Sequence, residues 1–275
     1  MPELPEVETI RRQMERDVVG RKVEGVVVRF GGRLNVKPAA FAAGIAGATF
    51  VAAGRRAKLL VLGLSNGNSL VVHLKMTGRF LLVPRGTAPT KHTHVVFRLS
   101  GGNDLHFEDV RKFGYLRLYR TEDLAREVFD KEAYGPEPLD PSFTPARFAM
   151  CVRGRGKKRI KPLLMEQTCI AGIGNIYADE SLWRAGIRPQ RKADSLSDAD
   201  LRRLHGAVRE SMKASLKLRG TSADMYVDLY GKKGENLSRL KAYGREGEPC
   251  GRCGTPIKKI AFAGRGTHFC PKCQS

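Results

Sequence analysis

The sequence predicts an α+β protein, in which an N-terminal helix precedes a β-sandwich domain and a helical domain ends in a zinc-finger β-hairpin. Short runs rich in Val, Leu and Phe, separated by turn signals such as SNGN and SGGND, occupy residues 22–120. Helical spacing dominates further on, and four cysteines near the end form two CxxC pairs. We therefore expect a β-sandwich domain over residues 1–134, a helical domain over residues 135–244 and a zinc finger over residues 245–275.

The opening segment MPELPEVETI has the pattern of a helix start. Pro5 suits the first helical position, and Glu6 and Glu8 are favourable in the first turn because the helix dipole is positive there. Apolar residues then recur at helical spacing, at Val7, Ile10 and Met14. A helix start alone would explain most of this segment without any catalytic role.

Pro2 is not explained by the helix. If Met1 is removed, Pro2 becomes a secondary amine with a reference pKa of about 7.7–8.0, so a substantial fraction is unprotonated at neutral pH. Such an amine is a nucleophile that can form an iminium ion. Lys58, at the start of the apolar run 58–64, is the second candidate nucleophile, because it stays mostly protonated unless burial lowers its pKa.

Six runs have the composition of short strands, and no long helix separates them. They span residues 22–30, 58–64, 69–76, 94–100, 104–109 and 114–120. This arrangement favours a sandwich or a barrel. The pattern becomes helical from residue 121 and breaks at three prolines between residues 136 and 141, where we place the domain boundary.

The second half of the chain has the patterns of helices. Ser197 is expected to cap a helix with apolar positions at Leu201, Leu204, Val208 and Met212. Asn175 is expected to open an earlier helix, after glycines that interrupt the pattern. Residues 220–235 have the composition of a loop.

The charge distribution indicates a polyanionic partner. The formal net charge is +21, and no Asp or Glu occurs between Glu24 and Asp104. A second acid-free stretch covers residues 141–165. Nucleic acid is the commonest polyanion, whereas a membrane surface is the lesser option because the basic residues are scattered through strand-like sequence. We find no run of about twenty apolar residues and expect a cytoplasmic protein that associates with the nucleoid.

Four cysteines have the spacing of a structural zinc site. Cys250 and Cys253 precede residues 254–269, and Cys270 and Cys273 follow them. Two CxxC knuckles at this separation predict one Zn²⁺ held by four thiolates, which fits a reducing compartment. The other two cysteines, Cys151 and Cys169, are expected to be unpaired, buried small side chains.

Several motifs could bind nucleic acid, each with a purely structural alternative. GIGNIYADE places glycines and Asn175 at a helix N-terminus, where backbone amides favour a phosphate, and Lys161 could add a charge. A glycine-linked helix pair is equally common as a structural device. In FEDVRKFGY, Arg111 and Phe113 would point the same way if they lay on a strand, presenting a cation and an apolar wedge. The alternative is a core Phe113 beside a solvated Arg111.

Further candidates lie on either side of these motifs. Met76 in HLKMTGRF is an unbranched apolar side chain that we expect beside cations at His73, Lys75 and Arg79, as a wedge for unstacking bases would be. Arg265 in GRGTHFC is expected at the hairpin tip of the zinc module, where its cation would be held rigidly.

The motifs PELPEVET, RRAKLL, HLKMTGRF, DVRKFG, GIGNIYADESLW and GRGTHFCPKCQ occur in order from residue 2 to residue 273. Together they resemble the bacterial formamidopyrimidine-DNA glycosylase family. The resemblance implies a base-excision repair enzyme that flips out and removes oxidised purines, 8-oxoguanine and formamidopyrimidines, from double-stranded DNA. It also implies strand cleavage at the abasic site by β,δ-elimination, a helix-two-turns-helix element in the helical domain, and a monomeric protein.

The same resemblance implies roles for individual residues. Pro2 would be the nucleophile and Schiff-base former, Glu3 the acid/base partner, and Glu6 a supporting carboxylate. Lys58 would assist β-elimination, and Arg265 would assist δ-elimination and bind phosphate. The implied DNA contacts are His73, Met76, His92, Arg111, Phe113, Lys157, Lys161 and Asn175, of which Met76, Arg111 and Phe113 would fill the gap left by the flipped nucleotide.

The sequence leaves open the lesion preference and two alternative functions. The segment GTSADMYVDLYGKKGEN, residues 220–236, departs from the family's lesion-capping segment, so the fine lesion preference does not follow from the resemblance. Endonuclease VIII-like enzymes, which favour oxidised pyrimidines, typically have glycine where this chain has Leu4. A non-catalytic zinc-containing nucleic-acid-binding protein is the third option, but it would have no use for a free secondary amine at Pro2.

Overall fold

A computed structural model describes residues 1–275, which divide into two compact units. Unit 1 comprises Met1–Lys131 together with Arg219–Gly234, and unit 2 comprises Glu132–Leu218 together with Glu235–Ser275. The segment Arg219–Gly234 lies beyond the helices in sequence, yet it belongs to the first unit. No helix is both long and apolar enough to cross a membrane.

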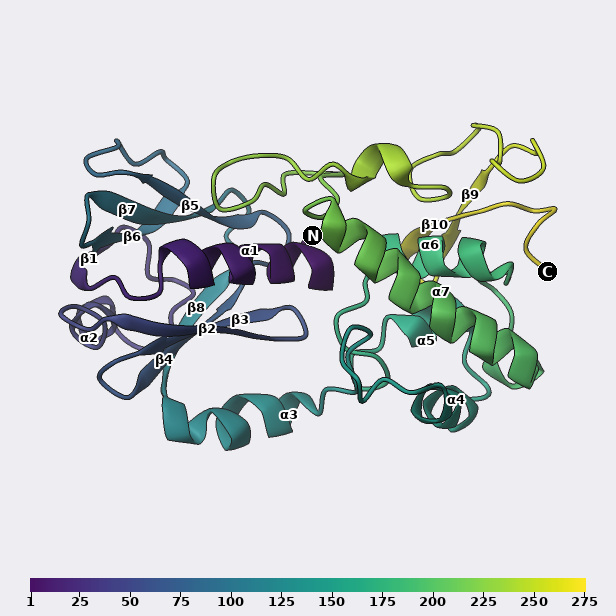
Figure 1. The fold of residues 1–275 in the computed structure, drawn as a ribbon, viewed down its shortest axis with the longest axis horizontal. Helices are drawn as coiled ribbons and strands as arrows, with labels where there is room; N and C mark the ends of the chain where they lie inside the picture. The colour runs from purple at the N-terminus through teal and green to yellow at the C-terminus, as the bar shows by residue number, and fades with distance from the viewer. The chain divides into compact units, whose positions relative to one another are not determined.

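Unit 1 contains two four-stranded antiparallel sheets. One sheet has the strand order β1-β6-β7-β5 and the other the order β2-β3-β4-β8, and Figure 1 shows the first helix, α1, between them. Its elements are α1 (Leu4–Asp17), β1 (Val23–Val28), α2 (Pro38–Ala43), β2 (Phe50–Arg56), β3 (Leu59–Leu64), β4 (Asn68–His73), β5 (Gly78–Pro84), β6 (Thr93–Leu99), β7 (Asn103–Asp109) and β8 (Tyr115–Arg120). The predicted sandwich is therefore present.

The core of unit 1 forms where α1 and both sheets turn their apolar faces to one another. The predicted stripe Val7, Ile10 and Met14 is fully buried there, so the helical spacing of α1 points at the core. Tyr226 and Leu229, from the segment Arg219–Gly234, are buried in the same cluster. This packing holds the predicted loop on the surface of the β domain.

Two strands of unit 1 were absent from the six predicted runs. Strand β2 has the sequence FVAAGRR and β5 has GRFLLVP. Gly, Ala, Arg or Pro in each strand make the strand composition hard to recognise. Each strand is defined by pairing, β2 with β3 and β5 with β7, which local composition does not reveal. The helical pattern after residue 121 appears as short turns at Thr121–Asp123 and Ala125–Phe129, followed by α3 (Asp130–Glu132).

Unit 2 is helical and ends in a two-stranded hairpin. Its elements are α4 (Pro145–Arg153), α5 (Ile160–Leu164), α6 (Asn175–Ala185), α7 (Asp198–Lys217), β9 (Lys258–Phe262) and β10 (Arg265–Phe269), with short helical turns at Ala193–Ser195 and Asn236–Arg239. The hairpin strands β9 and β10 pair antiparallel.

The helix starts follow the capping signals in the sequence. The Ser197 hydroxyl accepts a hydrogen bond from the Asp200 amide (3.1 Å), and Asp200 Oδ2 accepts one from the Ser197 amide (3.0 Å). This capping box confirms Ser197 as the N-cap of α7. Helix α6 begins at Asn175, as predicted. Helix α1 starts one residue earlier than expected, at Leu4, so Pro5 occupies its second position.

The prediction for Cys151 and Cys169 was wrong, because the two residues form a disulfide. Their Cα atoms lie 5.7 Å apart, within the range that a disulfide spans. The fold brings the last turn of α4 next to the loop between α5 and α6, and sequence spacing gives no sign of this proximity.

Candidate active site and nucleic-acid interface

A capping box between Glu3 and Glu6 orders the start of α1, directly after Pro2. Glu3 is the N-cap of α1, and its amide donates to Glu6 Oε2 (2.8 Å) in a capping box. Pro2, Glu3 and Glu6 are all buried, with Glu3 only 2% exposed. The structure thus places Pro2, Glu3 and Glu6 together, and it fixes the backbone directly behind Pro2.

The second oxygen of Glu6 holds the segment Arg219–Gly234. Glu6 Oε1 accepts a hydrogen bond from the Thr221 amide (2.8 Å). Gly220 has φ +87°, and a Cβ there would lie 2.9 Å from Glu6 Oε1, so the close approach requires glycine. Glu6 therefore ties the N-terminus to the predicted lesion-capping loop, a connection that the sequence did not indicate.

A second pair of contacts anchors the same segment further along α1. Gln13 Nε2 donates to Asp228 Oδ2 (3.1 Å), and Gln13 Oε1 accepts from the Leu229 amide (2.9 Å). Asp228 is fully buried and also accepts the amides of Tyr230 (3.0 Å) and Lys232 (2.9 Å). The part of the segment after residue 226 is consequently fixed to unit 1.

Lys58 lies in the tight turn between β2 and β3, directly before the apolar strand, as the sequence predicted. It is 7% exposed, and its neighbour Ala57 adopts a positive φ of 52°. Arg55 connects this turn to α1, because its Nη1 donates to Ala57 O (3.0 Å) and its Nε donates to Glu8 Oε2 (3.0 Å). Burial raises the pKa of Glu8, but hydrogen bonds from arginines including Arg55 outweigh burial and lower it, so Glu8 is an ionised anchor.

His73 is not the cation that we expected beside Met76. Burial, with smaller contributions from the charges of Lys75 and Lys58, lowers its pKa to about 3. Its Nδ1 accepts a hydrogen bond from the Lys75 amide (3.0 Å), which requires an unprotonated nitrogen. Arg79 is likewise not a free cation, because its Nη2 pairs with Glu108 Oε2 (2.7 Å).

Met76, Arg111 and Phe113 form one cluster, in which Arg111 and Phe113 are exposed and Met76 is half-buried. Arg111 Nη1 lies 3.0 Å from Met76 Sδ, and its guanidinium lies 4.9 Å from the centre of the Phe113 ring. Phe113 is 43% exposed, so the alternative of a core side chain is wrong. Arg111 and Phe113 lie on the loop between β7 and β8, and the cation lies over the ring.

The loop that carries this cluster is shaped by Asp109. The buried Asp109 carboxylate accepts the amides of Arg111 (3.1 Å) and Gly114 (2.6 Å) and the hydroxyl of Thr77. Lys112, at the tip, has a positive φ of 57°. Sequence reasoning missed both Asp109 and Thr77, because their hydrogen bond joins segments 32 residues apart in the chain. His92 lies beside it and accepts the Asp109 amide through its backbone oxygen (3.0 Å).

In unit 2, Asn175 opens α6 and contacts the hairpin. Its Nδ2 donates to the backbone oxygen of Gly266 (3.0 Å), while its Oδ1 is buried without a partner. Gly174 is the N-cap and offers no side chain. Helix α6 therefore starts without a side-chain cap from its N-cap residue.

Lys161 is placed differently from a surface phosphate contact. Its Nζ pairs with Asp179 Oδ1 (2.7 Å) and donates to the backbone oxygen of Gly266 (3.0 Å) and to Thr267 Oγ1 (2.8 Å). The Lys161 and Asp179 side chains are 2% and 0% exposed. Lys161 thus joins α5, α6 and β10 from inside, whereas Lys157 lies exposed on the turn before α5.

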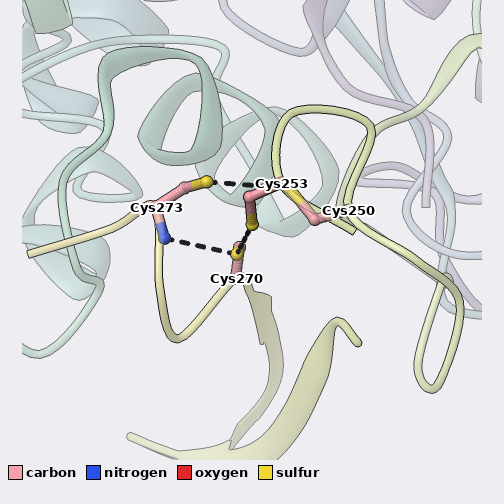
Figure 2. A group of neighbouring side chains, drawn as sticks. All are labelled: Cys250, Cys253, Cys270 and Cys273. Carbon is pink, nitrogen blue, oxygen red and sulfur yellow. Dashed lines mark hydrogen bonds between the residues drawn. The ribbon is translucent and has the colours of Figure 1, made fainter. Parts of the chain in front are cut away.

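Four cysteines converge at the end of the hairpin (Figure 2). All four sulfur atoms lie within 4.8 Å of one another, with Cys253 and Cys270 3.6 Å apart and Cys250 and Cys273 4.0 Å apart. Thiolates in a tetrahedral zinc site lie about 3.8 Å apart, so the donor set fits the metal. The protein therefore has one structural zinc site, made of the four predicted cysteines.

Arg265 is exposed at the tip of the hairpin. The turn between β9 and β10 consists of Ala263 and Gly264, both at positive φ, which suits a tight two-residue connection. No ion pair engages the Arg265 guanidinium. Since the zinc site and Lys161 fix the hairpin, the position of this cation is set by unit 2, as the sequence led us to expect.

Comparison with known families agrees with this geometry. A model of the formamidopyrimidine-DNA glycosylase N-terminal domain matches residues 1–116, and a model of the H2TH domain of that protein matches residues 134–227. A model of a zinc finger found in FPG and IleRS matches residues 247–275. The chain belongs to the formamidopyrimidine-DNA glycosylase family.

Individual relatives match over the whole chain. The formamidopyrimidine-DNA glycosylase of Desulfitobacterium hafniense strain DCB-2 is 43% identical over 275 residues, covering all of both chains. The formamidopyrimidine-DNA glycosylase of Herpetosiphon aurantiacus is 45% identical over 279 residues, again covering both chains. Full-length matches at this level leave no part of the chain outside the family.

Solved structures of the Lactococcus lactis enzyme are similar. A mutant bound to DNA containing Fapy-dG matches with a TM-score of 0.94 and 38% identity over all of both chains. A complex with abasic-site DNA matches with a TM-score of 0.93 and 37% identity over 99% of each chain. As a formamidopyrimidine-DNA glycosylase, the protein is a base-excision repair enzyme that removes oxidised purines from DNA and cleaves the strand at abasic sites.

Proposed function

We propose that Pro2 is the nucleophile of both reactions, once Met1 has been removed. The observation that carries this proposal is the position of Pro2, buried and directly attached to the capping box of Glu3 and Glu6. A terminal amine is normally frayed, but here the folded start of α1 supports it from the next residue onward. The amine is thus pre-oriented for attack on one carbon atom.

The chemistry follows from an amine of modest pKa. The Pro2 nitrogen attacks C1′ of the damaged nucleotide, and the bond from C1′ to the base breaks as the base leaves with a proton. Loss of the sugar ring oxygen from C1′ gives an iminium ion, in which the positive nitrogen accepts electron density from C2′. Loss of a C2′ proton then expels the 3′ phosphate in β-elimination, and a second elimination expels the 5′ phosphate.

We assign the proton transfers to Glu3. Its carboxyl group belongs to the residue adjacent to the nucleophile, and it would protonate the departing base or the opened sugar oxygen. Glu6 is a poorer candidate, because both of its oxygens accept backbone amides, from Glu3 and from Thr221, whereas the Glu3 carboxylate accepts the Glu6 amide in the capping box and belongs to the residue bonded to the nucleophile. Glu6 would therefore support the site by keeping Pro2 and the segment Arg219–Gly234 in place.

Lys58 and Arg265 would assist the eliminations. Lys58 is 7% exposed on a turn that Arg55 fixes to α1, so its ammonium group has a defined position in unit 1. The exposed Arg265 guanidinium, on the rigid hairpin tip, is suited to binding a phosphate as it becomes a leaving group. These assignments keep Lys58 as a general acid/base and not as the primary nucleophile.

The cluster of Met76, Arg111 and Phe113 would fill the space left when the damaged nucleotide leaves the helix. Its exposed Phe113 ring and half-buried Met76 thioether give apolar contact, and the Arg111 guanidinium adds hydrogen-bond donors toward the opposite base. His73, His92, Lys157 and Asn175 are the proposed phosphate or sugar contacts. For His73 the contact would be made by a neutral imidazole, because its pKa is about 3.

We further propose three functional domains at residues 1–134, 135–244 and 245–275, a monomeric protein, and a location at the nucleoid. The net charge of +21 supports the last of these. Fluorescence microscopy of a tagged chain would test it, since a diffuse signal that ignores the DNA would contradict it.

Borohydride trapping tests the nucleophile. Mass spectrometry of the purified protein should first show that Met1 is absent. Reduction during reaction with abasic-site DNA should then yield a covalent complex, and peptide mapping should place the adduct on the N-terminal peptide. An adduct on the peptide containing Lys58 would overturn the assignment. Pro2→Gly, which retains a primary amine, should still be trapped but with an altered ratio of base excision to strand cleavage.

A further inference from the structure

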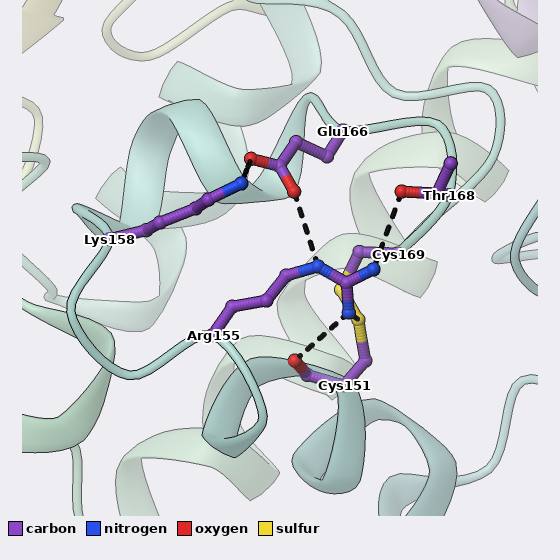
Figure 3. The surroundings of a disulfide bond; sticks show 6 residues. All are labelled: Cys151, Arg155, Lys158, Glu166, Thr168 and Cys169. Carbon is purple, nitrogen blue, oxygen red and sulfur yellow. Dashed lines mark hydrogen bonds and ion pairs between the residues drawn. A yellow bond between two sulfur atoms is a disulfide. The ribbon is translucent and has the colours of Figure 1, made fainter.

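The disulfide of unit 2 lies next in sequence to the proposed phosphate-binding turn, by which we mean residues 170–175 at the start of α6. Cys151 is in the last turn of α4, and Cys169 lies in the loop 165–174 that leads to the N-terminus of α6 (Figure 3). The bond closes a covalent ring over a sequence separation of 18 residues. This ring encloses α5 and Lys161, which holds the hairpin from inside.

A polar network spans the same two segments. Arg155 Nη1 lies 2.9 Å from Cys151 Sγ, and Arg155 Nη2 donates to Thr168 Oγ1 (3.4 Å). Arg155 Nε also pairs with Glu166 Oε2 (3.2 Å), and Lys158 pairs with the other oxygen of Glu166 (Figure 3). Arg155 therefore contacts both ends of the ring at the place where the disulfide closes it.

The loop beyond Cys169 is ordered by one glutamine. Gln167 Nε2 donates to the backbone oxygens of Met165 (2.8 Å) and Ile173 (2.9 Å), and its Oε1 accepts the Gly172 amide (2.8 Å). These bonds make residues 165–174 a single compact loop. A constraint applied at Cys169 is consequently passed along the loop to Gly174 and Asn175.

The two cysteines differ in exposure. Cys151 is half-buried, whereas Cys169 is only 1% exposed. An incoming thiolate can therefore reach Cys151 far more easily than Cys169. When the disulfide is open, the guanidinium of Arg155 beside Cys151 favours the thiolate, which is the reactive form.

The zinc site indicates that this disulfide is reversible in the working protein. The metal needs Cys250, Cys253, Cys270 and Cys273 as free thiolates, so the protein functions where thiols are kept reduced. Disulfides in such compartments are usually transient and redox-sensing. A permanent structural role for the Cys151 to Cys169 bond does not fit this environment.

We propose that Cys151 and Cys169 are a reversible thiol–disulfide site, open to low-molecular-weight thiols and disulfides, whose oxidation fixes the phosphate-binding turn and strengthens DNA binding. Reduction begins when a small thiolate attacks Cys151 Sγ and expels the Cys169 thiolate, which takes up a proton. A second small thiol then attacks the mixed disulfide and releases Cys151. In the net reaction, two small thiols are oxidised to one small disulfide, and the bond between Cys151 and Cys169 is reduced to two protein thiols.

Re-oxidation uses the same residues in reverse order. A low-molecular-weight disulfide reacts with the Cys151 thiolate to give a mixed disulfide and one small thiol. The buried Cys169 then attacks Cys151 Sγ, releases the second small thiol and closes the ring. In these terms Cys151 is the reactive cysteine and Cys169 the resolving cysteine.

The consequence for DNA rests on the proposed phosphate contact at the start of α6. With the ring open, residues 165–174 lose their covalent tie to α4 and keep only noncovalent ones, such as the Gln167 bonds, the Arg155–Glu166 pair and the hydrogen bond from the Ala171 amide to Pro136 O (3.1 Å). More of the binding energy is then spent on ordering the loop. We expect reduced protein to bind duplex DNA about fivefold more weakly than oxidised protein, a coupling at the low end of those found between linked sites.

The experiment compares the same full-length zinc protein after treatment with a small disulfide or a small thiol. Intact mass should differ by two hydrogen atoms, zinc content should be unchanged, and affinity for abasic-site duplex should fall on reduction. Hydrogen exchange at residues 165–174 should rise at the same time. The variant Cys151→Ser/Cys169→Ser should bind DNA like the reduced protein and should not respond to either treatment.

Two results would overturn the proposal. Complete alkylation of Cys151 and Cys169 after the oxidising treatment would mean that no disulfide forms. Equal DNA affinity in both redox states would show that the disulfide is not coupled to DNA binding, even if hydrogen exchange changes. Asn175→Ala in the oxidised protein tests the phosphate assignment separately. If that variant binds DNA as tightly as the unchanged protein, the phosphate assignment fails, whatever the redox comparison shows.

Discussion

The substitution Lys161→Met should destabilise unit 2 strongly. Lys161 and Asp179 form an ion pair 2.7 Å long whose side chains are 2% and 0% exposed. Removing the lysine leaves a buried carboxylate with His268 as its remaining partner, whose amide donates at 2.9 Å. Breaking one partner of a buried pair costs about 3–5 kcal/mol in the free energy of unfolding, which is a large fraction of the stability of a domain.

The assay can be made specific for unit 2. The chain has one tryptophan, Trp183, which lies in α6 and whose Nε1 is 3.4 Å from Cys250 Sγ. Its fluorescence during urea titration therefore follows unit 2 and not the β domain. Lys157→Met is the matched control, because this exposed lysine has no ion pair and its loss should change stability by less than about 0.5 kcal/mol.

A double substitution separates support of the hairpin from direct contact with phosphate. Lys161→Met/Asp179→Leu replaces both charges by apolar groups and should recover most of the lost stability. If Lys161 acts only from inside, DNA affinity should recover with it. If Lys161 reaches a phosphate, stability should recover while affinity stays low. A loss below about 1 kcal/mol in the single variant would refute the reasoning from burial.

Four other expectations can be checked directly. Glu3→Gln should keep DNA binding but lose about 100-fold or more in base excision in single-turnover assays, because it removes the proton donor; unchanged excision would exclude Glu3. Phe113→Ala should slow excision of a fully paired lesion more than of a mismatched one, since unstacking costs a few kcal/mol in the first case; equal losses would speak against a wedge. Cys250→Ser should lose zinc and weaken DNA binding while far-UV circular dichroism still shows the β domain. Because the pKa of His73 falls from about 6.5 in the unfolded chain to about 3 when folded, stability should drop as pH falls through that window, and His73→Gln should lessen the drop in acid titrations.

The salt dependence of binding tests the electrostatic argument as a whole. If about five phosphates are neutralised, log affinity should fall against log salt concentration with a slope of about −4.5. The excess of basic residues, at +21, is the reason to expect so steep a response. A flat response in filter-binding or fluorescence titrations would remove that argument.

The sequence by itself determined the features that depend on short-range physics. The capping signal at Ser197 placed the start of α7, because Ser197 and Asp200 satisfy each other's exposed amides, and the glycines before Asn175 placed the start of α6. The apolar stripe Val7, Ile10 and Met14 identified the buried face of α1. The paired CxxC motifs identified the zinc ligands, because each CxxC motif is formed by residues close in sequence. Only the meeting of the two motifs depends on the tertiary structure.

Tertiary structure alone decided what depends on residues far apart in the chain. Strands β2 and β5 exist because of their partners, and Arg219–Gly234 joins the β domain through Glu6 and Asp228. Lys161 was expected to contact a phosphate, and its buried pair with Asp179 could not be read from the sequence. The charge of His73 likewise depends on burial that no local pattern records. Cys151 and Cys169 are joined because α4 packs next to the loop before α6. In each case the decisive partner or the burial is supplied by residues distant in sequence, so it exists only in the folded chain and leaves no local pattern.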